Sequence, residues 1–135
     1  MQKRSFTLVE VMLVVTIIAA LVAIAIPQLL RMRINANDAA AQTTLRTIAI
    51  ACEDYASANH GNYPSEFGAL LNSTPAYLNE NYTSRSRQGY NFNCSAQMNM
   101  VGYNCSATPV ACNMTGAKIF TITTGSVLTN TDCAP

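Results

Sequence analysis

The sequence has little charge and no region where one sign dominates. Lys and Arg number 8 and Asp and Glu 7, which gives a formal net charge of +1 at neutral pH. Proteins that bind nucleic acids usually carry a basic patch or stripe. No such patch is present, and Arg85 and Arg87 beside Tyr82 and Tyr90 are too few to form one. Nucleic acid is therefore not an expected partner.

The sequence also lacks the patterns of metal sites and common active sites. Four of its five cysteines are separated by 11, 7 and 21 positions, without the close C-x₂₋₄-C pairs of zinc sites. No set of nucleophile, base and oxyanion donor is recognisable. Glu53 and Asp54 are adjacent, so on a helix they point in different directions, and we expect a solvated face instead of an acid/base pair. The sequence predicts no enzyme, metal or cofactor.

Charge is scarcest from Phe6 to Ile26, an apolar run whose one charged residue is Glu10. About 20 helical residues span the hydrocarbon core of a bilayer, whereas the apolar core of a cleavable signal peptide is about 7–15 residues long. We therefore predict a transmembrane helix over residues 6–27. Lys3 and Arg4 precede it, so residues 1–5 should be a cytoplasmic leader and residues 28–135 an extracytoplasmic domain.

A carboxylate inside such a helix needs a partner. Insertion scales give a cost of roughly 2.5–3.5 kcal/mol for an acidic residue at the helix centre and less near its end, so Glu10 is a functional hypothesis. The segment itself holds no Lys, Arg or His. The partner must be a lipid headgroup, water or a positive group on another chain, and a neighbour's free amino terminus would fit.

The apolar pattern continues past the membrane segment with helical spacing. Residues 28–59 contain neither glycine nor proline, so we predict one helix of about 50 residues, bent near Pro27 and ending near residue 60. An irregular connection should follow over 61–88, with a helical turn at 67–71. Strands are expected at residues 90–92, 101–103, 118–123 and 126–128. The predicted fold class is α+β, with a long N-terminal helix packed on a small antiparallel sheet.

The cysteines predict disulfides in residues 89–135, the sheet region, because this region is expected in an oxidising compartment. The candidates are Cys94, Cys105, Cys112 and Cys133, which allow three pairings. Cys52 lies on the apolar stripe of the helix and is expected to stay unpaired as a small buried side chain.

The N-terminal sequence Ser5 followed by FTLVEVMLVVTIIAALVAIAIPQLL resembles the processing site and transmembrane helix of type IV pilins and pseudopilins. This resemblance implies cleavage by a prepilin peptidase between Ser5 and Phe6, methylation of the Phe6 amino group, and pairing of Glu10 with a neighbour's amino terminus. Pro27 falls where the family's helix kinks. The family usually has glycine at the position of Ser5. The later run GAKIFTITTGSVL resembles the family's terminal hairpin.

The resemblance implies a pilus subunit that forms a helical homopolymer with the help of the pilus assembly machinery. Its precursor would reside in the inner membrane, with an extracellular pilus as the assembled form. Several alternatives stay open at this stage: a pseudopilin of a type II secretion system, an adhesive or DNA-binding minor pilin, and a simple signal anchor that tethers a periplasmic domain. The last leaves Glu10, Pro27 and the unbroken helix unexplained.

Overall fold

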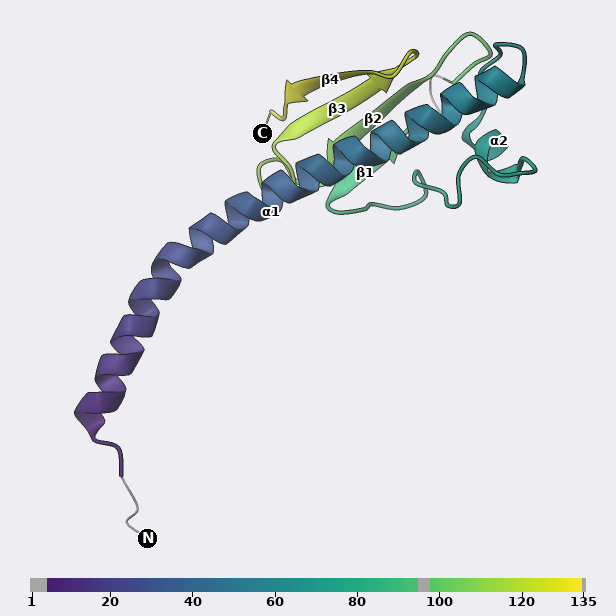
Figure 1. Ribbon diagram of the computed structural model, residues 1–135. Coiled ribbons are helices and arrows are strands. Elements are labelled where there is room, and N and C mark those ends of the chain that lie inside the picture. The colour runs from purple at the N-terminus through teal and green to yellow at the C-terminus, as the bar shows by residue number, and fades with distance from the viewer. Residues whose placement is uncertain (1–4, 95–97, 135) are drawn as a thin grey trace. The chain divides into compact units, whose positions relative to one another are not determined.

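The computed structural model describes residues 5–94 and 98–134. The elements in chain order are α1 (Leu8–Ala58), α2 (Phe67–Asn72), β1 (Tyr90–Asn93), β2 (Asn104–Pro109), β3 (Lys118–Thr123) and β4 (Val127–Asp132). A long helix accompanied by a four-stranded antiparallel sheet confirms the predicted α+β class (Figure 1). The chain forms two compact units, Met1–Arg33 and Ile34–Pro135, and α1 contributes to both. Residues 1–4, most of the expected leader, lie outside the described residues.

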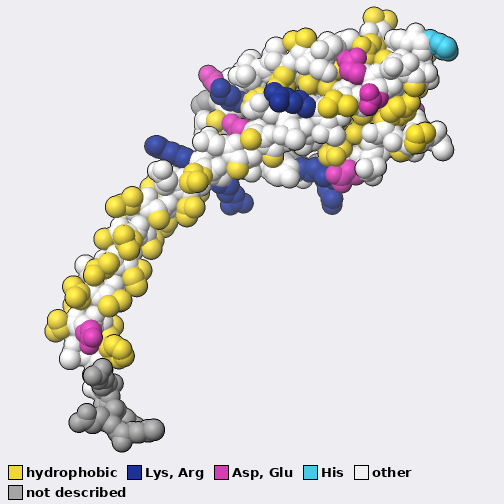
Figure 2. Space-filling model, viewed as in Figure 1, with side chains coloured by type: hydrophobic (Ala, Val, Ile, Leu, Met, Phe, Trp, Pro, Cys, Tyr) yellow, Lys and Arg dark blue, Asp and Glu magenta, His cyan; other side chains and the backbone are white. Residues whose placement is uncertain are grey.

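In the first unit α1 is a lone helix with apolar side chains on every side. It begins at Leu8, where the Thr7 side-chain oxygen accepts a hydrogen bond from the Glu10 amide (3.2 Å) and so caps the first turn. Apolar side chains cover its surface (Figure 2), and those from Leu8 to Met32 are exposed. An 18-residue window has a mean hydropathy of 2.9 and is entirely unburied, so α1 is long and apolar enough to cross a membrane. A helix that is apolar all round needs lipid or other helices around it.

In the second unit α1 buries one stripe against the sheet. Its buried positions recur every three or four residues, as expected for one face of a helix. They are Ala41, Leu45, Ile48, Ala49, Ala51, Cys52 and Ala56. Thr43, Thr44 and Thr47 each bond to the carbonyl four residues back, which satisfies their hydroxyls without a partner elsewhere.

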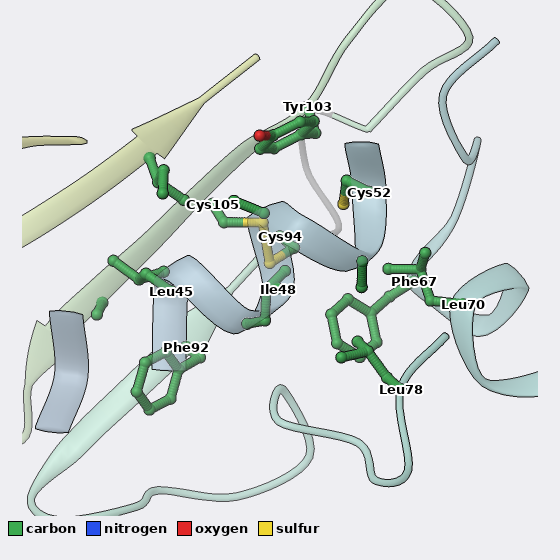
Figure 3. Packing of buried hydrophobic residues seen from close by; sticks show 14 of the residues in the cluster. Leu45, Ile48, Cys52, Phe67, Leu70, Leu78, Phe92, Cys94, Tyr103 and Cys105 are labelled. Atoms are coloured by element: carbon green, nitrogen blue, oxygen red, sulfur yellow. A yellow bond between two sulfur atoms is a disulfide. The ribbon is translucent and has the colours of Figure 1, made fainter. Parts of the chain in front are cut away.

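The sheet is a meander with strand order β1-β2-β3-β4, and every neighbouring pair is antiparallel. Inward-facing residues of the first three strands meet the α1 stripe, and the connection after α1 adds Phe67, Leu70 and Leu78 to the same core (Figure 3). Alternate residues face the core because side chains alternate across a strand. Strand β4 differs: all its residues except the half-buried Leu128 are exposed.

The expected strand at 101–103 is wrong. Asn99 forms a tight turn there, its side-chain oxygen accepting hydrogen bonds from the amides of Val101 (2.9 Å) and Gly102 (3.1 Å). The strand begins only at Asn104, with Cys105 and Ala107 facing the core. Small inward-facing residues explain why the strand was missed, since they carry little of the β-branched and aromatic pattern by which strands are recognised.

Candidate assembly site

Glu10 lies in the first turn of α1, on the unit formed by residues 1–33. The sequence Thr7-Leu8-Val9-Glu10 has the spacing of a capping box, in which the glutamate side chain would reach back to the Thr7 amide. In the described part of the chain the Thr7 half of this arrangement forms, and the Glu10 carboxylate makes no hydrogen bond or ion pair. Helix capping therefore does not account for the carboxylate.

The surroundings of Glu10 are apolar. A groove along this face of the helix is lined by Phe6, Glu10, Val11, Val14 and Val15. Phe6 is 77 % exposed and Ser5 beside it is exposed as well, so the bond between them is accessible. The positive end of the helix dipole lies at this terminus and favours a negative charge there. The site thus combines an accessible backbone, an exposed aromatic ring and an unpaired carboxylate.

Pro27 lies inside α1, and the helix continues through it to Ala58. Proline has no amide hydrogen, so the carbonyl of Ala23 loses its usual donor at this turn. The helix is thus weakened locally at the boundary predicted for the membrane segment.

Asp38 and Glu53, both on α1, hold the helix against the sheet. The Asp38 carboxylate accepts hydrogen bonds from the Tyr90 hydroxyl (2.7 Å) and the Ala117 amide (3.2 Å), just before β3. Gly116 makes room for this contact, because a Cβ atom there would collide with the Tyr90 hydroxyl. Burial, together with the bond to Asp38, raises the pKa of Tyr90 above its ordinary value.

Glu53 accepts three hydrogen bonds and fastens the other end of β3. Its donors are the hydroxyls of Tyr63 (2.9 Å) and Tyr103 (3.0 Å) and the amide of Gly125 (2.9 Å) in the β3–β4 turn. The expectation of a solvated face therefore holds for the exposed Asp54 and is wrong for Glu53. Glu53 is four residues beyond Ala49 and one beyond Cys52, both buried, and this position at the edge of the stripe could have indicated its role.

Disulfide bonding in the C-terminal third is present, as the cysteine count predicted. The structure joins Cys94 to Cys105 and Cys112 to Cys133, with Cα atoms 4.2 and 5.8 Å apart. The first bridge is buried in the core, and the second is partly exposed near the C-terminus. Cys52 is a buried free thiol. Burial, reinforced by the nearby Glu53 charge, raises its pKa to about 12, so little reactive thiolate forms at neutral pH.

An exposed apolar helix that continues into the core helix of a disulfide-bonded domain defines a class of protein: a subunit whose N-terminal segment must be covered by lipid or by other subunits. Residues 1–26 match the family model described as the prokaryotic N-terminal methylation motif. The chain is 35 % identical over 91 residues to the type IV wide pilus major component PilA4 of Thermus thermophilus, covering 64 % of this chain and 69 % of the relative. The chain belongs to the type IV pilin family. No solved structure matches it.

Proposed function

We propose that this chain is a structural, non-enzymatic subunit of an extracellular type IV pilus. The observation that carries the proposal is the exposed, unpaired Glu10 carboxylate on the apolar surface of α1. A carboxylate in hydrocarbon is unfavourable unless a positive group approaches it. A second subunit can supply both that group and the apolar surface that replaces lipid.

Processing would create the positive group. A prepilin peptidase would hydrolyse the Ser5–Phe6 bond, release residues 1–5 and leave an amine on Phe6, which would then be methylated. Glu10 of an incoming subunit would pair with that amine on its neighbour and so set the axial register of the two helices. The apolar segments would then pack together as a filament core, with Pro27 permitting local adjustment of the helix.

The same proposal implies a membrane topology for the precursor. Residues 1–5 would be cytoplasmic and residues 6–27 would cross the inner membrane, because Lys3 and Arg4 precede the apolar segment. Residues 28–135 would then lie outside the inner membrane. Two disulfides support this placement, since such bonds persist in oxidising compartments. The expected partners are further copies of the chain, the prepilin peptidase and the pilus assembly machinery.

A pilus is favoured over the short filament of a secretion system. The relative that shares 35 % identity is named as the major component of a wide pilus, and its match extends well beyond the N-terminal motif that pilins and pseudopilins share. Two disulfides would also suit a domain displayed on the cell surface.

Mass spectrometry of sheared surface filaments, with and without reduction, tests the proposal. The expected product is a chain that begins at methylated Phe6. Its two disulfides should yield four thiols on reduction. A chain that retains Met1 and occurs in membranes alone would contradict the proposal and favour a simple signal anchor. A correctly processed chain that is absent from sheared surface filaments would instead favour a pseudopilin.

A further inference from the structure

A small pocket lies where α1 ends, within the unit formed by residues 34–135. Its volume is about 250 Å³, and the residues that line it are Tyr55, Asn59, His60, Asn62, Tyr63, Ser65 and Met100. Ligand pockets commonly combine apolar or aromatic walls with a few placed polar groups. This pocket has both, and it contains no residue of the assembly site.

The aromatic walls are fixed in position. Tyr63 donates its hydroxyl hydrogen to Glu53, and its ring packs against Tyr103 with centroids 5.6 Å apart. Tyr55 makes an edge-to-face contact with Tyr77 at 5.5 Å. Rings held in this way offer a ligand an apolar surface at little additional cost in side-chain entropy.

The two asparagines in the lining each donate one hydrogen bond to the backbone. The Asn59 amide nitrogen donates to the Tyr55 carbonyl (2.8 Å), and the Asn62 amide nitrogen donates to the Asn59 carbonyl (3.1 Å). Each amide nitrogen thereby uses one of its two hydrogens on the backbone. Within the described residues neither side-chain oxygen has a hydrogen-bond donor, so both remain available to a ligand that carries donors.

His60, at the end of α1, has a backbone conformation that is unusual for its residue type. His60 has φ of 58°, in the left-handed region, and Gly61 after it donates its amide hydrogen to the Ala56 carbonyl (2.8 Å), closing the helix. Glycine is the residue that most readily adopts the left-handed conformation at this position of a helix end. Histidine at position 60 is conformationally less favourable than glycine, and His60 is one of the residues that line the pocket.

Charge narrows the ligand class. The pocket lining contains no Lys, Arg, Asp or Glu side chain. A phosphate would find no cation beyond the imidazole, and a metal ion would find no carboxylate. A ligand rich in hydroxyl donors with an apolar ring face would match the acceptors and the aromatic walls together. We propose that this pocket binds one ring of a neutral saccharide.

The test uses the full-length subunit extracted in detergent micelles, so that binding is measured independently of filament assembly. The probes are methyl glycosides of glucose, galactose and N-acetylglucosamine, with sialic acid and inorganic phosphate as anionic comparisons, and binding is followed by saturation-transfer NMR. A ligand of about a dozen heavy atoms should bind with an affinity on the order of millimolar. Absence of binding by all three neutral glycosides, or stronger binding by the anions, would overturn the proposal.

Two variants locate the binding. His60→Gly removes the imidazole and suits the left-handed backbone, so the domain should fold while affinity falls at least about threefold, or about 0.65 kcal/mol from RT ln 3. Met100→Ala should weaken binding similarly. Met114→Ala is the matched control, because Met100 and Met114 are 66 % and 76 % exposed and Met114 lies outside the pocket. Unchanged affinity in both His60→Gly and Met100→Ala would show that the sugar binds elsewhere.

Discussion

Two carboxylates on the same helix, Glu10 and Glu53, have opposite surroundings. Glu10 lies on the exposed apolar segment and has no partner within the described residues, whereas Glu53 accepts three hydrogen bonds from its own domain. The same contrast holds for apolar side chains: Leu13 is 61 % exposed, and Leu45 is fully buried. The unit from residue 34 onward buries a core of its own and provides hydrogen-bond partners for Glu53, whereas the large apolar side chains of the unit up to residue 33 are exposed and its Glu10 carboxylate has no partner within the described residues.

The largest expected effect comes from the unsatisfied carboxylate. Glu10→Ala should lower the yield of surface filaments by at least about tenfold. A loss of about 1.4 kcal/mol per subunit contact already lowers the association constant of that contact by a factor of ten. Membrane insertion and folding of the domain should persist, since Glu10 belongs to the other unit and its carboxylate makes no hydrogen bond or ion pair within the described residues. The yield is measured by shearing filaments from cells and comparing them with the membrane-bound pool.

Glu66→Ala is a suitable control because Glu66 is an exposed carboxylate outside α1, and its filament yield should match the wild type. Normal filament formation by Glu10→Ala would show that charge pairing does not set the register. The contrast between the two carboxylates would then have no functional meaning.

The next effect tests which disulfide stabilises the domain more. Closing loops of 11 and 21 residues should contribute about 3 kcal/mol each, and the longer loop is favoured by only about 0.6 kcal/mol. Cys94 and Cys105 are buried, so serine there adds hydroxyls without guaranteed partners at about 1–3 kcal/mol each. Burial outweighs loop length, and C94S/C105S should unfold at lower denaturant concentration than C112S/C133S.

A double alanine variant at the same positions separates the two causes. C94A/C105A also removes the buried bridge but adds no hydroxyl, so it should be more stable than C94S/C105S. If C94A/C105A and C94S/C105S unfold at the same denaturant concentration, loss of the Cys94–Cys105 cross-link alone explains the lower stability of C94S/C105S.

The same substitution at two leucines tests the contrast in packing. Leu45→Ala should destabilise the domain by about 2–5 kcal/mol and lower its melting temperature by more than about 10 °C. Leu13→Ala should leave the melting of the domain unchanged, because Leu13 is an exposed side chain of the other unit. Circular dichroism of both variants in detergent checks this, and equal melting temperatures would contradict the separation of the two units.

Sequence reasoning predicted the parts of the fold that periodicity controls. The apolar run at 6–26 and the uninterrupted spacing after it predicted the long helix, and the alternation in Lys118–Thr123 predicted β3. Strand β2 was not predicted at its observed position, because its inward-facing residues Cys105 and Ala107 are small and give no clear strand pattern. Of the candidate site, Glu10 stood out because a charge in an apolar run is costly, and its pairing with another subunit stays a prediction.

Glu53 could not be recognised in the same way. Its donors come from Tyr63, Tyr103 and Gly125, which are distant in sequence and meet only when the chain folds. The position of Glu53 at the edge of the buried stripe indicates that it is half-buried, but it does not indicate which residues donate to it. Similarly, the cysteine spacings allowed three pairings, and only the antiparallel register of β1 and β2 brings Cys94 next to Cys105.

The smallest expected effect concerns the tyrosines that Glu53 holds. Burial, with the Glu53 bond adding to it, raises the pKa of Tyr103 to about 12, whereas the unfolded chain titrates near 10. Neutral Tyr103 therefore contributes stability that is complete below about pH 10 and is lost as the pH rises towards 12.

Tyr103→Phe should cost about 1–2 kcal/mol at pH 7, because it removes the bonds to Glu53 and from the Ser126 amide. The difference in unfolding free energy between wild type and variant should then narrow between pH 10 and 12. Tyr55→Phe serves as the control, since the Tyr55 hydroxyl belongs to neither bond. If the difference in unfolding free energy between wild type and Tyr103→Phe stays constant from pH 10 to 12, Glu53 and Tyr103 are not coupled.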